Sequence, residues 1–210
     1  MIVPNNISIK GIIQIGANDG NEINSFSHHT NNILCFEPVD EAKNKCIERS
    51  KSFTKSNIII SDYIVSDKTG EVDFYIGQAS GNSSMFDLNP ERPLFHQWNK
   101  HEKKVKKNSI TLDDFFEQNS NIKISDYNYI YMDVQGAEHL ILNGATKSLN
   151  HIDFIWMEVS YFEIYFNTML FDEMTKLCDS LGYKLYYHKE STSNQNQGDA
   201  LYVKKTFYDK

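Results

Sequence analysis

The segment GIIQIGANDG at residues 11–20, followed by ILCFEP at residues 33–38, decides the fold of this chain. The isoleucines of the first segment form a short β-branched run, which is typical of a buried parallel strand. Gly16 and Gly20 bracket a tight turn that allows backbone amides to approach a ligand closely. A helix predicted at residues 21–26 would direct its positive end to the same place. The pattern therefore predicts a strand, a ligand-binding turn and a helix.

An acidic residue ends the second predicted strand. Glu37 follows the apolar run at residues 33–36, where one carboxylate can accept hydrogen bonds from both hydroxyls of a ribose. In dinucleotide-binding turns a second glycine lets the backbone approach a pyrophosphate, but here Asn18 holds that place, with Asp19 beside it. The carboxylate of Asp19 would repel phosphates, whereas it favours the cationic S-adenosylmethionine. The charge pattern therefore predicts S-adenosylmethionine as the cofactor in preference to NAD.

Composition bounds the class of protein. The 210 residues are 40% hydrophobic and 13% aromatic, which is typical of one globular domain over residues 1–210. The net charge of −7 gives no general reason to bind nucleic acid, and no apolar run is long enough to span a bilayer, so we expect a soluble, cytoplasmic protein. The first strand begins about ten residues into the sequence, which is compatible with a domain excised from a longer multidomain chain. The three cysteines, Cys35, Cys46 and Cys178, are expected to be reduced and buried, in a strand and two helices.

The middle of the chain supplies further candidate ligands. A third strand at residues 58–60 ends beside Asp62, which is equally compatible with an adenine contact and with a solvated loop acid. A strand or hairpin follows at residues 65–76. The long loop after it offers the hydroxyls of Ser83 and Ser84. It also offers a cation, a possible base and a stacking face that a sugar can use, in Arg92, His96 and Trp98.

Two charged clusters have mainly structural interpretations. The lysines at positions 100, 103, 104, 106 and 107 are more typical of an exposed strand face than of a site for an anionic substrate. Thr111 is a predicted helix N-cap, and Asp113 and Asp114 follow it at the positive end of that helix.

The fourth and fifth predicted strands deliver acids to the ligand edge of the sheet. The strand at residues 127–134 presents Asp133, and Glu138 and His139 follow in the first turn of the next helix. The strand at residues 154–159 carries Glu158 near its carboxyl end. A helix ending before Gly182 and two antiparallel strands, at residues 183–188 and 200–204, complete the predicted sheet.

Taken in order, these segments resemble the FkbM family of S-adenosylmethionine-dependent methyltransferases. The matching segments are IGANDG (15–20), CFEP (35–38), VSDKTGEVDFY (65–75), GNSSM (81–85), ITLDDF (110–115), MDVQGAEHLILNGA (132–145) and WMEV (156–159). The resemblance implies an α/β class I methyltransferase (Rossmann-like) fold, with a seven-stranded, mostly parallel sheet of order 3-2-1-4-5-7-6 and helices on both faces. It also implies transfer of a methyl group to a hydroxyl, commonly that of a sugar in a glycan or glycoconjugate.

The resemblance also assigns roles to single residues. It places Gly16, Asn18, Asp19, Gly20, Glu37, Ser83 and Ser84 at the cofactor, and Asp133 and Glu138 in the fourth-strand motif. Asp62 is a further candidate at the cofactor. Gln135 and Glu138 are expected on the substrate side, together with the loop residues Arg92, His96 and Trp98.

Asp133 is the first candidate for the base or for orienting the substrate, with Glu158 and His139 behind it. Asp133 can instead hold the ammonium group of the cofactor, and the residues leave this alternative open. The carboxylates of Asp133, Glu138 and Glu158 are possible Mg²⁺ ligands, but their spacing does not require a metal, so metal-independent transfer is predicted. Two other classes remain: a non-catalytic module of the same fold that binds S-adenosylmethionine or a glycan, and a nicotinamide-dependent oxidoreductase, which Asn18 and Asp19 disfavour.

Overall fold

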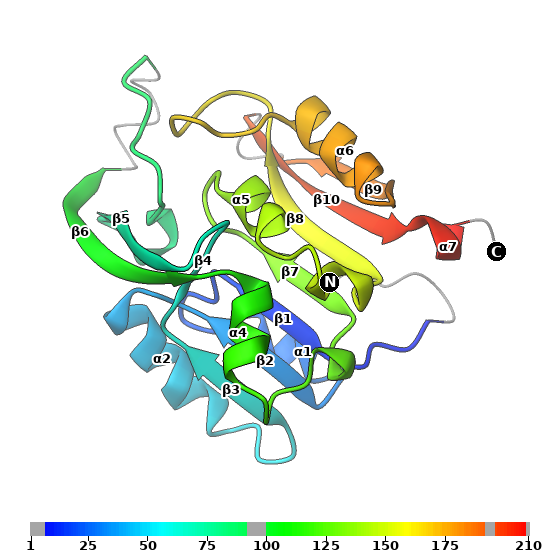
Figure 1. Cartoon of the computed structure of the whole chain (residues 1–210). Helices are drawn as coiled ribbons and strands as arrows, with labels where there is room; N and C mark the ends of the chain where they lie inside the picture. The colour runs from blue at the N-terminus through cyan, green and yellow to red at the C-terminus, as the bar shows by residue number, and fades with distance from the viewer. Residues whose placement is uncertain (1–6, 92–99, 192–195, 209–210) are drawn as a thin grey trace.

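The chain folds around two sheets in the computed structural model, which describes residues 7–91, 100–191 and 196–208 (Figure 1). The large sheet has seven strands: β1 (Ile12–Ile15), β2 (Asn32–Phe36), β3 (Asn57–Ser61), β7 (Tyr129–Met132), β8 (Phe154–Ser160), β9 (Tyr183–Glu190) and β10 (Gln197–Lys204). The small sheet has three: β4 (Ile64–Val65), β5 (Gly70–Gly77) and β6 (His101–Ile110).

The large sheet has the predicted topology. Its strand order is β3-β2-β1-β7-β8-β10-β9, which becomes 3-2-1-4-5-7-6 when only its own strands are numbered. The pairs from β3 to β8 are parallel, and β10 runs antiparallel to both of its neighbours. The order along the chain reverses between β1 and β7, so the crevice for a ligand is expected outside the carboxyl ends of these two strands.

Helices cover both faces of the large sheet. Alternate residues of the strands point to opposite faces, as the period of two requires. One face packs on α4 (Leu112–Gln118), α5 (Glu138–Asn143) and α6 (Phe171–Ser180), which lie in front of the sheet in Figure 1. The other face packs on α1 (Ile23–Phe26) and α2 (Asp40–Ser50). A last helix, α7 (Lys205–Tyr208), and three 3₁₀ turns, η1 (Ser80–Asn82), η2 (Ile124–Asp126) and η3 (Ser148–Asn150), complete the described elements.

The small sheet, at the left of Figure 1, carries the lysine-rich segment. Strand β6 lies between β4 and β5 and pairs antiparallel with β5 over its length. Lys104 and Lys106 each contact Asp73 of β5 at 2.8 Å, and Lys107 contacts Asp40 at 3.3 Å. The cluster is therefore the exposed strand face that the charge pattern predicts, with acids placed opposite its cations.

Some predicted boundaries differ from the structure. The helix predicted at residues 21–26 is a single turn, Ile23–Phe26, and Glu22 at its start makes no side-chain capping bond. Strand β10 begins at Gln197, three residues before the predicted start, and Gln197 and Gly198 pair with the end of β8. The three cysteines are free and buried, in β2, α2 and α6 as predicted. Within the described ranges, no helix combines the length and the apolar character that a membrane crossing requires.

Candidate active site

A pocket opens at the carboxyl ends of β1, β2 and β7, where the sheet topology predicts a ligand. It encloses about 870 Å³, part of it open to solvent. The turn after β1, the end of β2, strand β4 and the segment that follows β5 form its walls. The residues that contribute polar groups to the lining are Gln14, Asn18, Asp19, Asn21, Glu22, Glu37, Tyr63, Ser80, Ser83, Tyr131 and Asp133.

The turn after β1 is closed against β7. Gly16 has a φ of 81°, and a Cβ atom there would lie 2.0 Å from the backbone oxygen of Asp133. A side chain is therefore excluded by both the backbone conformation and the close approach. Asn18 also has a positive φ, 46°, and its side-chain oxygen accepts a hydrogen bond from the Ser80 hydroxyl at 2.7 Å. This contact links the turn to η1 on the opposite wall of the pocket.

Glu37 is buried at the end of β2, with 5% of its surface exposed. Its two carboxylate oxygens accept hydrogen bonds from the backbone amides of Asn18 and Val39, at 2.7 and 2.8 Å. Burial raises the pKa of Glu37 to about 7, and these two amides oppose the rise. The carboxylate is thus fixed in place while it still lines the pocket, which suits recognition of a pair of hydroxyls.

The side chain of Asp19 is already paired. Its carboxylate contacts Arg49 of α2 at 3.1 Å, and the same guanidinium donates to the Asp19 backbone oxygen at 2.9 Å. The negative charge that favours a cationic ligand therefore has to come from other acids. Glu22, Glu37 and Asp133 line the pocket, and no lysine, arginine or histidine within the described ranges does so. A pocket of this charge fits a cationic ligand and opposes a pyrophosphate.

Asp133 follows β7 and faces a second carboxyl group. The Gln135 side-chain amide donates to Asp133 Oδ1 at 2.6 Å and to Glu158 Oε2 at 3.3 Å. Burial raises the pKa of Asp133 to about 6, although the Gln135 hydrogen bond opposes this. Burial and then the charge of Asp133 raise the pKa of Glu158 well above its usual range. Two carboxyl groups that share one amide are expected to hold one proton between them near neutral pH.

The remaining predicted cofactor residues differ in position. Ser83 lines the pocket and its hydroxyl accepts from the Gly77 amide at 3.0 Å. Ser84 is fully buried, and its hydroxyl donates to the Gln135 backbone oxygen at 2.8 Å. Gly20 packs on Cys46 of α2, where a Cβ atom would lie 2.9 Å from the sulfur. Asp62 lies outside the pocket lining and forms an exposed ion pair with Lys43 at 2.9 Å.

The predicted substrate residues are also only partly assembled at the site. Glu138 is buried, and one of its carboxylate oxygens accepts from the amides of Val134 and Gly136, so it supports the turn after β7. His139 stacks on Phe86 at a ring-centroid distance of 5.8 Å and lies outside the pocket lining. Burial lowers the pKa of His139, which favours its neutral form. The predicted sugar contacts Arg92, His96 and Trp98 lie outside the described residues.

Several site residues escaped the sequence analysis. Glu22 lines the pocket and accepts from the Gln14 side chain at 3.0 Å; its position two residues after Gly20 was the available signal. Tyr165, between β8 and α6, donates to the Gln135 side-chain oxygen, and Gln197 of β10 donates to the Glu158 carboxylate. Local sequence carries no signal for such long-range side-chain contacts.

Known proteins resemble this chain in sequence and in fold. A family model described as the methyltransferase FkbM domain matches residues 14–185. The 2-O-methyltransferase NoeI of Sinorhizobium fredii is 28% identical over 162 residues, which are 73% of this chain and 65% of that protein. The chain thus spans just under two thirds of the length of this relative.

Solved structures share the fold at low sequence identity. An FkbM methyltransferase from Methylobacillus flagellatus has a TM-score of 0.61 at 15% identity, covering 93% of this chain and 43% of that one. The magnesium protoporphyrin IX methyltransferase of Synechocystis, solved with bound S-adenosylmethionine, has a TM-score of 0.54 at 6% identity, covering 95% and 72%. These likenesses concern the fold, whereas the family match extends over most of the sequence. The chain therefore belongs to the FkbM methyltransferase family.

Proposed function

We propose that this protein transfers a methyl group from S-adenosylmethionine to a hydroxyl group of a sugar in a glycan or glycoconjugate. The observation that carries the proposal is the charge of the pocket. Three acids that lack an ion-pair partner among the lining residues, Glu22, Glu37 and Asp133, surround a cavity that no basic side chain of the described residues enters. This charge fits a donor that carries a sulfonium and an ammonium group.

S-adenosylmethionine is the cofactor of this site, and the residues present fit it. Glu37 would accept hydrogen bonds from the ribose hydroxyls, and the turn at Gly16 and Asn18 would lie against the amino acid portion. Apolar groups of Ile64, Phe74 and Met85 provide a wall for the adenine ring. When bound, the cofactor supplies an electrophilic methyl group on a good leaving group.

The chain itself has to position the acceptor and remove a proton. Asp133 is the proposed proton acceptor because it is half-buried, lines the pocket and has a pKa raised to about 6, so it is mostly ionised at pH 7. Glu158 lies on the other side of the Gln135 amide. In its protonated form, Glu158 is the proposed hydrogen-bond donor to a second oxygen of the sugar. Positioning by these groups supplies part of the rate enhancement.

The choice of a hydroxyl acceptor is supported by the relative NoeI, whose name describes a 2-O-methyltransferase. It is also supported by the chemistry beside the pocket, where the carboxyl groups of Asp133 and Glu158 and the amide of Gln135 gather at the ends of β7 and β8. Side chains of this kind bind vicinal hydroxyl groups through paired hydrogen bonds.

We further propose that transfer needs no metal ion. Among the residues that the structure describes, no three histidine, cysteine or acidic side chains are grouped to hold one. Activity should survive extensive treatment with EDTA. Loss of activity in EDTA that Mg²⁺ restores would contradict this part of the proposal.

The direct test uses S-adenosylmethionine with a deuterated methyl group. The whole chain would be incubated with a panel of hexose- and deoxyhexose-containing oligosaccharides, and products would be sequenced by mass spectrometry. We expect one labelled methyl ether on a sugar hydroxyl, formed far more slowly by Asp133→Asn. Binding of the cofactor without transfer to any oxygen acceptor would favour a non-catalytic binding module, and labelled nitrogen or carbon would contradict O-methylation.

A further inference from the structure

The backbone at Gln135 is held in a conformation that few residues adopt. Its φ is 58°, and Gly136 follows with a φ of 98°. A Cβ atom on Gly136 would lie 2.4 Å from Thr168 Oγ1, and the Gln135 oxygen accepts the Ser84 hydroxyl at 2.8 Å. Left-handed backbone at a non-glycine residue costs free energy, so surrounding contacts have to maintain it. They direct the Gln135 side chain between β7 and β8.

The Gln135 side chain connects one hydroxyl to two carboxyl groups. Its oxygen accepts the Tyr165 hydroxyl at 2.8 Å. Its nitrogen donates to Asp133 at 2.6 Å and to Glu158 at 3.3 Å. Since a tyrosine hydroxyl donates best to the amide oxygen, and two carboxylates would repel that oxygen, the partners select one orientation of the amide. Both N–H groups of the amide are then committed to the two acids.

We propose that Tyr165 is a positioning residue: its hydroxyl fixes the Gln135 amide so that Asp133 keeps the negative charge of the acid pair and Glu158 keeps the proton. This inference rests on the proposed function only in naming Asp133 as the proton acceptor. Tyr165 lies on the segment between β8 and α6, 30 positions from Gln135 in the sequence. Its side chain is 1% exposed, so water cannot readily replace its hydroxyl.

Burial also keeps Tyr165 protonated. Its pKa is raised far above the usual range for tyrosine, first by burial and then by the charges of Glu158 and Asp133. It therefore remains a donor at every pH at which the protein is used. The titratable groups that act on the acid pair come from four elements or their ends and from the segment between β8 and α6. They are Glu22, Tyr131, Glu138, Asp199 and Tyr165. All of them are acids or phenols, so the Gln135 amide is the principal group that favours an ionised Asp133.

A second buried tyrosine provides a matched control. Tyr183 of β9 is also 1% exposed, and its hydroxyl donates to the backbone oxygens of Leu149 and Ile152 at 3.0 and 2.9 Å. Tyr183→Phe removes hydrogen bonds from an equally buried ring without contact to the Gln135 amide. It separates a general loss of stability from an effect on the acids.

The test follows carboxyl protonation directly. The whole chain, labelled with ¹³C in aspartate and glutamate, would be titrated by NMR, and Asp133 would be assigned with Asp133→Asn. We expect Tyr165→Phe to raise the proton affinity of Asp133 roughly tenfold, because the freed amide no longer directs both N–H groups to the acids. Tyr183→Phe should lower the melting temperature and leave this titration unchanged.

The outcomes separate this inference from the proposed function. A folded Tyr165→Phe variant with the titration curve of the wild type would overturn the role of Tyr165. If Tyr165→Phe does not fold, Gln135→Met provides the test, because it removes the amide and should raise the proton affinity of Asp133 further. An unchanged curve for Gln135→Met would equally overturn the proposal. The titration needs neither donor nor acceptor, so failure to bind S-adenosylmethionine would count against the proposed function alone.

Discussion

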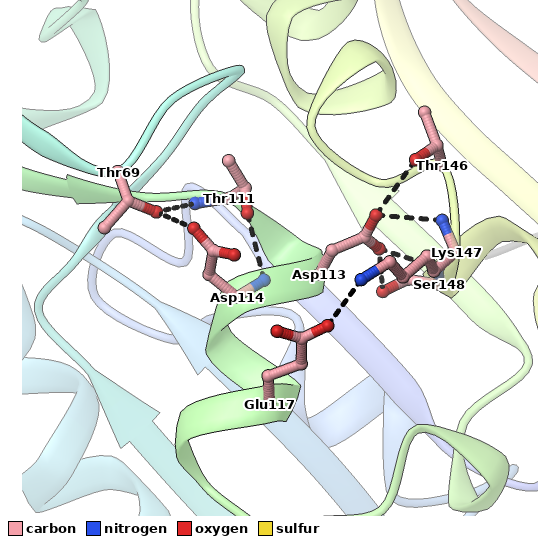
Figure 2. Close-up of polar contacts among 8 residues, drawn as sticks. All are labelled: Thr69, Thr111, Asp113, Asp114, Glu117, Thr146, Lys147 and Ser148. Atoms are coloured by element: carbon pink, nitrogen blue, oxygen red, sulfur yellow. Dashed lines mark hydrogen bonds and ion pairs between the residues drawn. The ribbon is translucent and has the colours of Figure 1, made fainter.

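Asp113 and Asp133 are both half-buried aspartates, the first in the first turn of α4 and the second directly after β7, yet their surroundings are opposite. Figure 2 shows Asp113 at the start of α4, where its carboxylate receives hydrogen bonds from residues 146–148, which lead into η3. These come from the Thr146 hydroxyl (3.1 Å), the Lys147 amide (2.8 Å) and both the amide and the hydroxyl of Ser148 (2.7 Å each). Asp133 receives one side-chain hydrogen bond within the described part of the chain, from Gln135, and faces Glu158.

The two pKa values shift in opposite directions for this reason. Burial would raise the pKa of Asp113, but the Lys147 and Ser148 donors outweigh it and the net shift is downward. For Asp133, burial outweighs one donor and the pKa rises to about 6. The number of hydrogen-bond donors around a partly buried aspartate therefore decides its role. Many donors keep it ionised and let it hold two segments together, whereas few donors raise its pKa and leave it available for proton transfer.

The neighbours of Asp113 follow the same structural pattern. Thr111 caps α4 by accepting from the Asp114 amide at 3.0 Å, as predicted, and Thr69 donates to the Asp114 carboxylate (Figure 2). Lys147 adds an ion pair with Glu117. These contacts attach α4 to the bend before β5 and to the residues that lead into η3. None of these residues lines the pocket.

The largest expected effect is that of Asp133→Asn on catalysis. Loss of the proposed proton acceptor should lower kcat/KM by about 10²- to 10⁴-fold, since general base catalysis contributes factors of this size. The affinity for S-adenosylmethionine should fall much less than kcat/KM, because the carboxylates of Glu22 and Glu37 remain in the pocket. Calorimetry on the same variant checks this, because a large loss of affinity with little loss of kcat would assign Asp133 to the cofactor.

Glu37→Gln should weaken binding of S-adenosylmethionine by about 10- to 100-fold. Hydrogen bonds to a charged group contribute about 1.5–3 kcal/mol, and the variant removes the charge while it keeps the size of the side chain. Isothermal titration measures the change. Asp62→Asn is the matched control, because its exposed ion pair with Lys43 lies outside the pocket lining, and it should bind as the wild type does.

Asp113→Asn should act on stability and leave the site intact. The new amide group would oppose donors of Thr146, Lys147 or Ser148, which should cost about 1–2 kcal/mol in the free energy of unfolding. Urea unfolding measures the loss. Asp179→Asn, which breaks an exposed ion pair with Lys205, should change stability by less than about 1 kcal/mol. If Asp113→Asn unfolds at the same urea concentration as the wild type, the claim that the hydrogen bonds of Asp113 stabilise the fold is wrong.

The smallest effect concerns the pH dependence of stability. Burial raises the pKa of Glu138 to about 7, like that of Glu37, and the pKa of Asp133 to about 6. Between about pH 4.5 and 7 the folded chain therefore binds more protons at these groups than the unfolded chain does. Their contribution to stability is greatest at the acidic end and is lost as the pH rises through the folded pKa values. Urea midpoints of the apo protein should fall across this window.

Glu138→Gln sharpens that measurement. Its amide oxygen can still accept from Val134 and Gly136, but the side chain no longer ionises, so the midpoint should fall less steeply with pH. A slope equal to that of the wild type would show that Glu138 does not titrate in this range.

The sequence predicts the fold well because local patterns determine it. Alternating and continuous apolar runs identify the strands, and Gly16 marks a turn that only a residue without a side chain can make. The strand order 3-2-1-4-5-7-6, inferred from the resemblance, is confirmed. The exposed lysine strand is confirmed as well, but its partner β5 and the separate small sheet follow from pairing between distant segments.

The site was less predictable because its contacts are long-range. Asp19 and Arg49 are 30 residues apart, and no local pattern indicates that they form an ion pair. This pair neutralises the carboxylate from which the sequence predicted a cationic cofactor. The Tyr165 hydroxyl reaches Gln135 only because the segment between β8 and α6 folds back over the end of β7. Sequence reasoning located the acids correctly on strand ends, whereas their charges and partners required the packed structure.

The most direct test of the account compares two ligands of opposite charge by isothermal titration of the whole chain. The account predicts that S-adenosylmethionine binds with micromolar affinity and that NADH does not bind, because acids line the pocket. The affinity for S-adenosylmethionine should also decrease in high salt. Tight binding of NADH, or no binding of S-adenosylmethionine by the folded wild type, would contradict the central claim that the charge of this pocket selects the methyl donor.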